Sequence, residues 1–130
     1  MKKFVKVLAL LACSLAFVFA LASCSNVSQS YADKINEAAK NNEHISYDDA
    51  VDALGDECVD FTLAVLNNHT GALIAVKGVK KDEYEAKVKN ATAEEAEKLE
   101  AIIIVVLLDK CTSATYTNAK DAMQKANEAK

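Results

Sequence analysis

The pattern of apolar and polar positions begins with one long apolar run. Val7 to Ala22 is a stretch of 16 residues interrupted only by Cys13 and Ser14, and three lysines precede it, Lys2, Lys3 and Lys6. A positive start followed by a short apolar run is typical of a secretory signal peptide. A helix that spans the hydrocarbon core needs roughly 20 apolar residues, so this run is short for a permanent membrane span.

Helical spacing appears further along the chain. Tyr31, Ile35 and Ala38 recur on one side of a predicted amphipathic helix over residues 31–41. A second, shorter helix is predicted after Ser46, which is placed to cap it, and Gly55 is placed to end it. These two helices come before any strand.

Alternation of apolar and polar residues then predicts strands. Residues 59–65 alternate as in a strand with one wet face, residues 67–71 read as a turn, and residues 72–79 as a second strand. Ile102 to Leu108 is uninterrupted and mostly β-branched, which predicts a central strand covered on both faces. Asp109 and Lys110 are expected to turn the chain into a fourth strand over residues 111–117.

Helical segments complete the pattern. Residues 81–100 are charged and read as a helical insert between the two hairpins, with Thr92 and Glu95 as a capping box. Residues 119–126 predict a weak terminal helix, too rich in alanine to bury much. We therefore expect an α+β fold, in which two hairpins form an antiparallel sheet of about four strands and the helices pack on one face.

The end of the apolar run carries the most specific motif. Leu21, Ala22 and Ser23 precede Cys24, and this order resembles the lipobox of bacterial lipoproteins. The resemblance implies that Cys24 receives a diacylglyceryl group and that the signal peptidase cuts just before it. We predict a signal peptide over residues 1–23, a lipidated cysteine with a flexible polar tether over residues 24–30, and a single α+β domain over residues 31–130.

Three other interpretations of the N-terminus remain open at this point. Leu10 to Cys13 also spells a lipobox, but it leaves an apolar stretch of only six residues. Ala20 and Ala22 form a site whose cleavage releases a soluble secreted protein, and an uncleaved run gives a retained helix. Each buried CH₂ contributes about 0.8 kcal/mol, so lipid on Cys24 with two or more acyl chains anchors the protein firmly.

Charge limits the partners of the exported protein. Removing the three early lysines from 15 leaves 12 lysines against 19 acidic residues, a formal charge of −7 on the remaining 107 residues. The chain has no arginine, and phosphate binding depends on clustered basic residues, so nucleic acid is excluded as an expected partner. The remaining length allows one domain.

Cys58 and Cys111 are candidates for chemistry in an oxidising compartment. A disulfide between them closes a loop of 52 intervening residues. Such a bond stabilises the folded state by roughly 3–4 kcal/mol on the chain-entropy model. Two reduced, partly buried thiols are the alternative. The spacing does not match a zinc site, and no metal or cofactor is expected.

No other residues form a recognisable catalytic set. His44 and His69 are the only neutral-pH bases, and neither lies in a nucleophile or metal motif, so both are expected at the surface. Asp48 and Asp52 share a helix face and are expected to be solvated rather than to bind a cation. We therefore do not expect an enzyme.

A second resemblance concerns the folded part. His44 to Gly55, which ends in Leu-Gly before the strands, and the later segment Val106 to Tyr116 are similar to small lipoprotein domains. The similar families are those of the β-barrel assembly component BamE (SmpA/OmlA) and of the β-lactamase inhibitor proteins. The resemblance implies a helix before a small sheet, and no binding residue is transferred from it.

These observations lead to one expected function and two alternatives. We expect a lipoprotein anchored in the cell membrane or outer membrane, facing the extracytoplasmic side, which binds another envelope protein or assists envelope assembly. One alternative is a small envelope enzyme or thiol-redox protein that uses Cys58 or Cys111. The other is a small-ligand binding lipoprotein.

Overall fold

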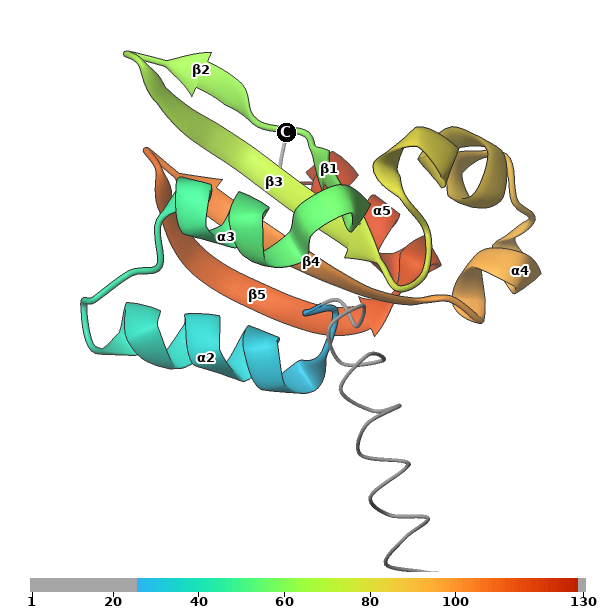
Figure 1. Ribbon diagram of the computed structural model, residues 1–130, viewed down its shortest axis with the longest axis horizontal. Helices are drawn as coiled ribbons and strands as arrows, with labels where there is room; N and C mark the ends of the chain where they lie inside the picture. The colour runs from blue at the N-terminus through green and yellow to red at the C-terminus, as the bar shows by residue number, and fades with distance from the viewer. Residues whose placement is uncertain (1–25, 129–130) are drawn as a thin grey trace, which may run out of the picture.

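The computed structural model describes residues 26–128, so the predicted signal peptide, its cleavage motif and Cys24 lie outside the described residues. The chain folds into a small antiparallel sheet with helices packed against it (Figure 1). The helical elements are α2 (Gln29–Lys40), α3 (Tyr47–Leu54), η1 (Gly55–Glu57), η2 (Lys81–Glu83), η3 (Glu85–Lys89), α4 (Ala93–Glu97) and α5 (Ala119–Glu128). The strands are β1 (Cys58–Asp60), β2 (Leu63–Val65), β3 (Asn68–Val76), β4 (Glu100–Leu107) and β5 (Lys110–Asn118). The predicted α+β class with an antiparallel sheet is confirmed.

The first predicted strand is present but interrupted. β1 and β2 both pair with β3 in one unbroken register, since Cys58 lies opposite Ala75 and Leu63 opposite Thr70. The interruption at residues 61–62 lies opposite Gly71, whose φ is +147°. A Cβ there would lie 2.8 Å from the Phe61 carbonyl oxygen, so glycine lets the two chains approach closely. The sheet order is therefore β1/β2, β3, β4, β5.

Both hairpin turns contain two residues in the left-handed region. Leu66 and Asn67 connect β2 to β3 with φ of 54° and 68°, and Leu108 and Asp109 connect β4 to β5 with φ of 48° and 68°. Positive φ at both central residues matches the twist of paired strands. Both turns lie slightly earlier in the chain than the sequence pattern predicted.

The sheet is buried on both faces, and this corrects the expectation that all helices share one face. Ile102, Ile104 and Val106 of β4 point into a core with α2 and α3, while Ala101 and Ile103 point into a second core on the opposite face. That second core contains residues of α4, η3 and α5. In Figure 1, α5 is partly hidden behind the sheet, on the side away from α3. The prediction of β4 as a central strand covered on both faces is confirmed.

The terminal helix α5 buries more of its side chains than its alanine-rich composition indicated. Ala119, Ala122 and Ala126 are all buried against the second core. Their small side chains let α5 lie close to the sheet, so their number did not prevent burial. The expectation that this helix buries little is therefore wrong.

The start of the domain also differs from the expectation. The side chain of Ser28 caps α2 by accepting from the N–H of Tyr31, and Val27 is buried with only 2% of its surface exposed. The Asn26 side chain donates to the carbonyl oxygen of Ala53 at 2.8 Å. Residues 26–30 therefore belong to the folded domain and do not form a flexible tether.

The predicted capping of α3 is confirmed. Ser46 accepts from the N–H of Asp49 at 3.1 Å, and Gly55 ends the helix with a φ of 61°. Thr92 and Glu95 likewise form the predicted capping box of α4. Within residues 26–128, we find no helix that has both the length and the apolar character needed to cross a bilayer.

Candidate functional site

Large exposed apolar side chains gather at the hairpin end of the sheet. Their exposed fractions are 85% for Leu66, 73% for Leu63, 54% for Leu107, 44% for Leu108 and 42% for Val65. We call these five residues the apolar tip. They come from the β2–β3 and β4–β5 hairpins, whose turns lie side by side at one end of the molecule (Figure 1). Grouped exposed apolar residues of this kind mark interaction surfaces more often than scattered ones do.

Part of the apolar tip extends the face that α5 covers. Side chains alternate along a strand, so Leu63 and Val65 continue the side on which Val59 and Phe61 pack into the second core. A groove of about 600 Å³ lies between these side chains, Thr70 and Ala72 of β3, and Ala126 near the end of α5. The apolar tip therefore borders a surface hollow and is not an isolated projection.

Hydrogen bonds join the two hairpins behind the apolar tip. The Oδ1 atom of Asp109 accepts from the backbone N–H of His69 at 2.7 Å and lies 3.0 Å from its Nδ1 atom. The Asp109 N–H donates to the His69 carbonyl oxygen at 2.9 Å, and the Leu108 N–H donates to Thr70 Oγ1 at 3.0 Å. These bonds hold the pKa of Asp109 below its ordinary value, first through the backbone N–H and then through the ring of His69. The turns are thus fixed relative to each other.

Tyr47, at the start of α3, connects this pair to β1. Its ring stacks on His69 with the centroids 3.8 Å apart and the planes within 8°, and its hydroxyl donates to Asp60. That hydrogen bond, followed by burial, raises the pKa of Tyr47 to about 12. Burial raises the pKa of Asp60, but hydrogen bonds from Thr62 and Tyr47 hold it below its ordinary value. We call Tyr47, Asp60, His69 and Asp109 the polar clasp.

The polar clasp contains no side-chain nucleophile beside its histidine within the residues that the structure describes. A carboxylate that orients a histidine is one half of a nucleophilic site, and the other half is an activated hydroxyl or thiol. Within residues 26–128, no serine or cysteine side chain hydrogen-bonds to the ring of His69, and the Thr62 hydroxyl donates to Asp60 instead. The clasp joins the start of α3, β1 and the two hairpins behind the apolar tip. His44, which is also half-buried, lies outside the clasp.

Both candidate cysteines are buried free thiols. Burial raises the pKa of Cys58 to about 11 and that of Cys111 to about 12. The strands that carry them are separated by β3 and β4, and a spacing of about 4.8 Å between strands places them at least roughly 14 Å apart. A disulfide needs Cα atoms within about 7 Å, so this geometry favours the two reduced thiols over the possible bond. Reactive cysteines need a lowered pKa and access to solvent, and these two have neither.

Other candidate sites from the sequence are not brought together. Asp48 and Asp52 are exposed on α3, and the described part of the chain holds no group of three or more metal-ligating side chains. An open depression of about 630 Å³ lies beside the start of the domain, between Asn26, Lys34 and Asp49. It is shared between polar residues of α2 and α3 and does not overlap the apolar tip.

The apolar tip itself was not predicted from the sequence. Leu63 and Val65 were assigned to a half-buried strand, and Leu107 and Leu108 to a fully covered one. One sequence feature could have predicted this exposure. The Asn67-Asn68 pair directly after Leu66 favours a tight turn there, and residues next to a hairpin turn tend to be exposed.

Comparison with known proteins adds no assignment: no family model, curated protein or solved structure matches this chain. The resemblance to bacterial lipoproteins and to BamE-like domains therefore stays a prediction from the sequence.

Proposed function

We propose that this protein is a membrane-anchored extracytoplasmic lipoprotein that acts as a non-catalytic protein-interaction module and binds another envelope protein through the apolar tip. The observation that carries the proposal is the gathering of five exposed leucine and valine side chains at the fixed hairpin end. Exposed apolar patches of this kind mark protein–protein interaction sites. The partner surface is expected to be apolar at its centre with a polar rim.

The anchor part of the proposal rests on the lipobox, Leu21 to Cys24. Only Ser25 separates Cys24 from Asn26, whose side chain already bonds to the domain, so lipid on Cys24 would hold Asn26 within about 7 Å of the lipidated residue. A long flexible tether is absent from this arrangement, because Asn26 and Val27 already pack on the domain. The end of the molecule that carries Val27 therefore faces the membrane.

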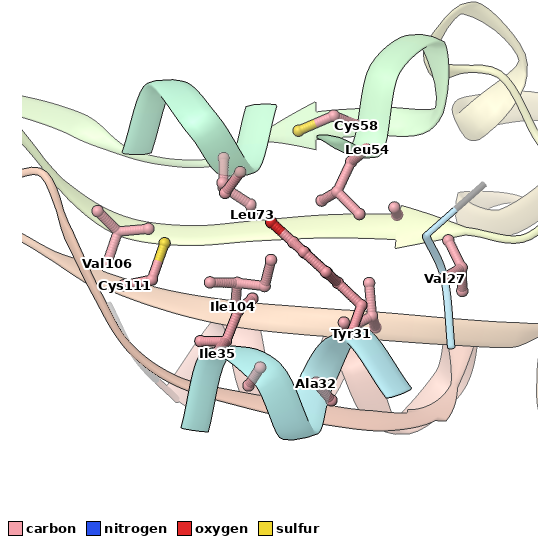
Figure 2. Close-up of a cluster of buried hydrophobic side chains, with 14 residues drawn as sticks. Val27, Tyr31, Ala32, Ile35, Leu54, Cys58, Leu73, Ile104, Val106 and Cys111 are labelled. Carbon is pink, nitrogen blue, oxygen red and sulfur yellow. The ribbon is translucent and has the colours of Figure 1, made fainter. Parts of the chain in front are cut away.

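The apolar tip lies at the other end of the sheet from Val27. Figure 2 shows Val27 near the C-terminal end of β3, whereas Val106 and Cys111, beside the β4–β5 turn, lie at the opposite end. β4 has eight residues and spans roughly 25 Å between these ends. The tip is thereby held away from the membrane that carries the anchor and is available to a protein partner.

A photo-crosslinking experiment tests the interaction. A photoreactive residue in place of Leu66 is expected to give a discrete crosslinked product in the native host, and the added substitution Leu63→Asp is expected to abolish it. The control places the same photoreactive residue at Gln124, which is exposed on α5. Equal crosslinking from both positions, or a Leu66 product unaffected by Leu63→Asp, would contradict a specific site at the apolar tip.

A further inference from the structure

We propose that the outer edge of β2 takes an extended segment of the partner protein as an added strand. This inference rests on the proposed function, because it names the way in which the partner is held. The partner segment is an uncharged stretch of polypeptide with apolar residues at alternate positions. Backbone hydrogen bonds supply the affinity in this mode of binding, and side-chain pockets supply the specificity.

The backbone of β2 has polar groups that point away from β3. The Phe61 N–H donates to the Ala72 carbonyl oxygen at 2.9 Å, so these two residues form a hydrogen-bonded pair of the antiparallel ladder. Such pairs alternate, so Leu63 and Val65 bond to β3 while the N–H and C=O of Ala64 point outward. The N–H of His69 opposite Ala64 is directed to Asp109 of the neighbouring turn, which agrees with this assignment.

At the opposite edge of the sheet, a side chain bonds to the outward backbone groups of β5, which is not seen at β2 among the described residues. The Asn36 side chain of α2 donates to the Ala114 carbonyl oxygen at 2.9 Å and accepts from the Ala114 N–H at 2.9 Å, so at this residue of β5 it takes the place of a neighbouring strand. Just before β2, the side chain of Asp60 at the end of β1 accepts from the N–H of Thr62 at 2.8 Å. Beyond Thr62, no side chain in the described part of the chain is placed to cover the edge at Ala64.

The side chains of β2 favour pairing and do not prevent it. Edge strands of soluble proteins usually carry lysine, proline or an inward-pointing charge that blocks contact with other strands. Residues 61–68 contain none of these, and Leu63 and Val65 stand exposed beside the groove of about 600 Å³. An added strand places its own alternate side chains next to this groove.

The position of the anchor decides between possible occupants. Two copies of this chain related by a twofold axis would pair β2 antiparallel, which reverses the strand direction and points the two Val27 ends in opposite directions. In the proposed orientation, with the Val27 end toward the membrane and the apolar tip away from it, only one of two such copies reaches the membrane. Lipid is also unsuitable, because the tip lies at the end of the sheet away from Val27 and because lipid tails offer nothing to the Ala64 N–H and C=O. A separate protein remains as the occupant.

A defined peptide provides the test. The probe is a fluorescent peptide of about nine residues in which valine and threonine alternate, with a lysine at each end. We expect it to bind the full lipid-modified chain in nanodiscs and to slow amide hydrogen exchange within residues 62–66. The matched control peptide carries N-methyl groups on alternate backbone nitrogens, which removes hydrogen-bond donors and keeps the side chains. It is expected to bind at least about tenfold more weakly.

A protein variant tests the same edge independently. Ala64→Pro removes the outward N–H and leaves the bonds of Leu63 and Val65 to β3, so the fold is retained while peptide binding falls by about tenfold or more. Equal binding of the methylated peptide, equal binding to Ala64→Pro, protection outside residues 62–66, or no binding of the parent peptide would each overturn strand addition. If Leu66 crosslinking stays dependent on Leu63 in those cases, the interaction module stands and only its mode of binding is wrong.

Discussion

Two leucines at the hairpin turns carry a cost that folding alone does not explain. Leu66 and Leu108 both adopt positive φ, where asparagine or glycine is more stable by roughly 1–2 kcal/mol, and both expose their side chains. Neither residue contributes to a core in return. Unfavourable backbone positions of this kind concentrate at functional surfaces, which supports a binding role for the apolar tip.

The Asp109 carboxylate makes the hairpin end sensitive to acid. Its pKa is lower in the folded protein than in the unfolded chain, so it adds stability above the ordinary aspartate pKa of about 3.9. That contribution is lost as the pH falls through the lower folded value. We expect Asp109→Asn to lower the urea midpoint at about pH 7 and to make progressively less difference below about pH 4.

The control for this prediction is Asp52→Asn, which changes an exposed acid on α3. It is expected to leave the urea midpoint nearly unchanged at both pH values. A difference between wild type and Asp109→Asn that stays constant down to about pH 2 would show that the charge of Asp109 does not stabilise the polar clasp.

At the scale of elements, the sequence predicted those features that depend on neighbouring residues. The Ser46 and Thr92 caps and the central strand β4 follow from local pattern, and all three were expected. The sequence did not predict that helices cover both faces of the sheet. The residues that α5 buries are small alanines, and their low hydrophobicity gave no sign of a core contact. The polar clasp was also missed, since it joins residues up to 62 positions apart in the sequence, Tyr47 to Asp109.

Asn36 connects α2 to the edge of β5, and its loss is expected to lower the free energy of unfolding. Asn36→Ala removes two partly buried hydrogen bonds along the edge of β5 and is expected to reduce the free energy of unfolding by roughly 1–3 kcal/mol. Gln29→Ala is the control in the same helix, because its side chain bonds only to the exposed Asp33 and costs about 0.5 kcal/mol or less.

Chemical denaturation of the two variants measures this difference. Concentration-dependent aggregation of Asn36→Ala is expected as well, since the edge of β5 then becomes available for pairing. Equal stability of Asn36→Ala and Gln29→Ala would mean that Asn36 does not close this edge.

At the scale of the whole molecule, the sheet lies between the proposed anchor and the proposed interaction surface. The polar composition of residues 25–30 suggested a tether, and the single apolar residue Val27 was too weak a signal to predict that the domain begins there. With lipid on Cys24, as we propose, the orientation of the domain relative to the membrane follows from the position of Val27, which lies three residues further along the chain and is buried in the fold. In the proposed arrangement the apolar tip points away from the membrane, and the whole arrangement depends on lipid at Cys24.

Metabolic labelling with palmitate, combined with mass spectrometry of the mature N-terminus, tests that claim most directly. We expect the wild-type protein to be labelled, to begin at Cys24 with the mass of a lipid-modified cysteine, and to require detergent for release. Cys24→Ala is expected to abolish the label, whereas Cys13→Ala is expected to retain it. An unlabelled protein that washes free without detergent, or a Cys24→Ala variant that is still labelled, would contradict the account.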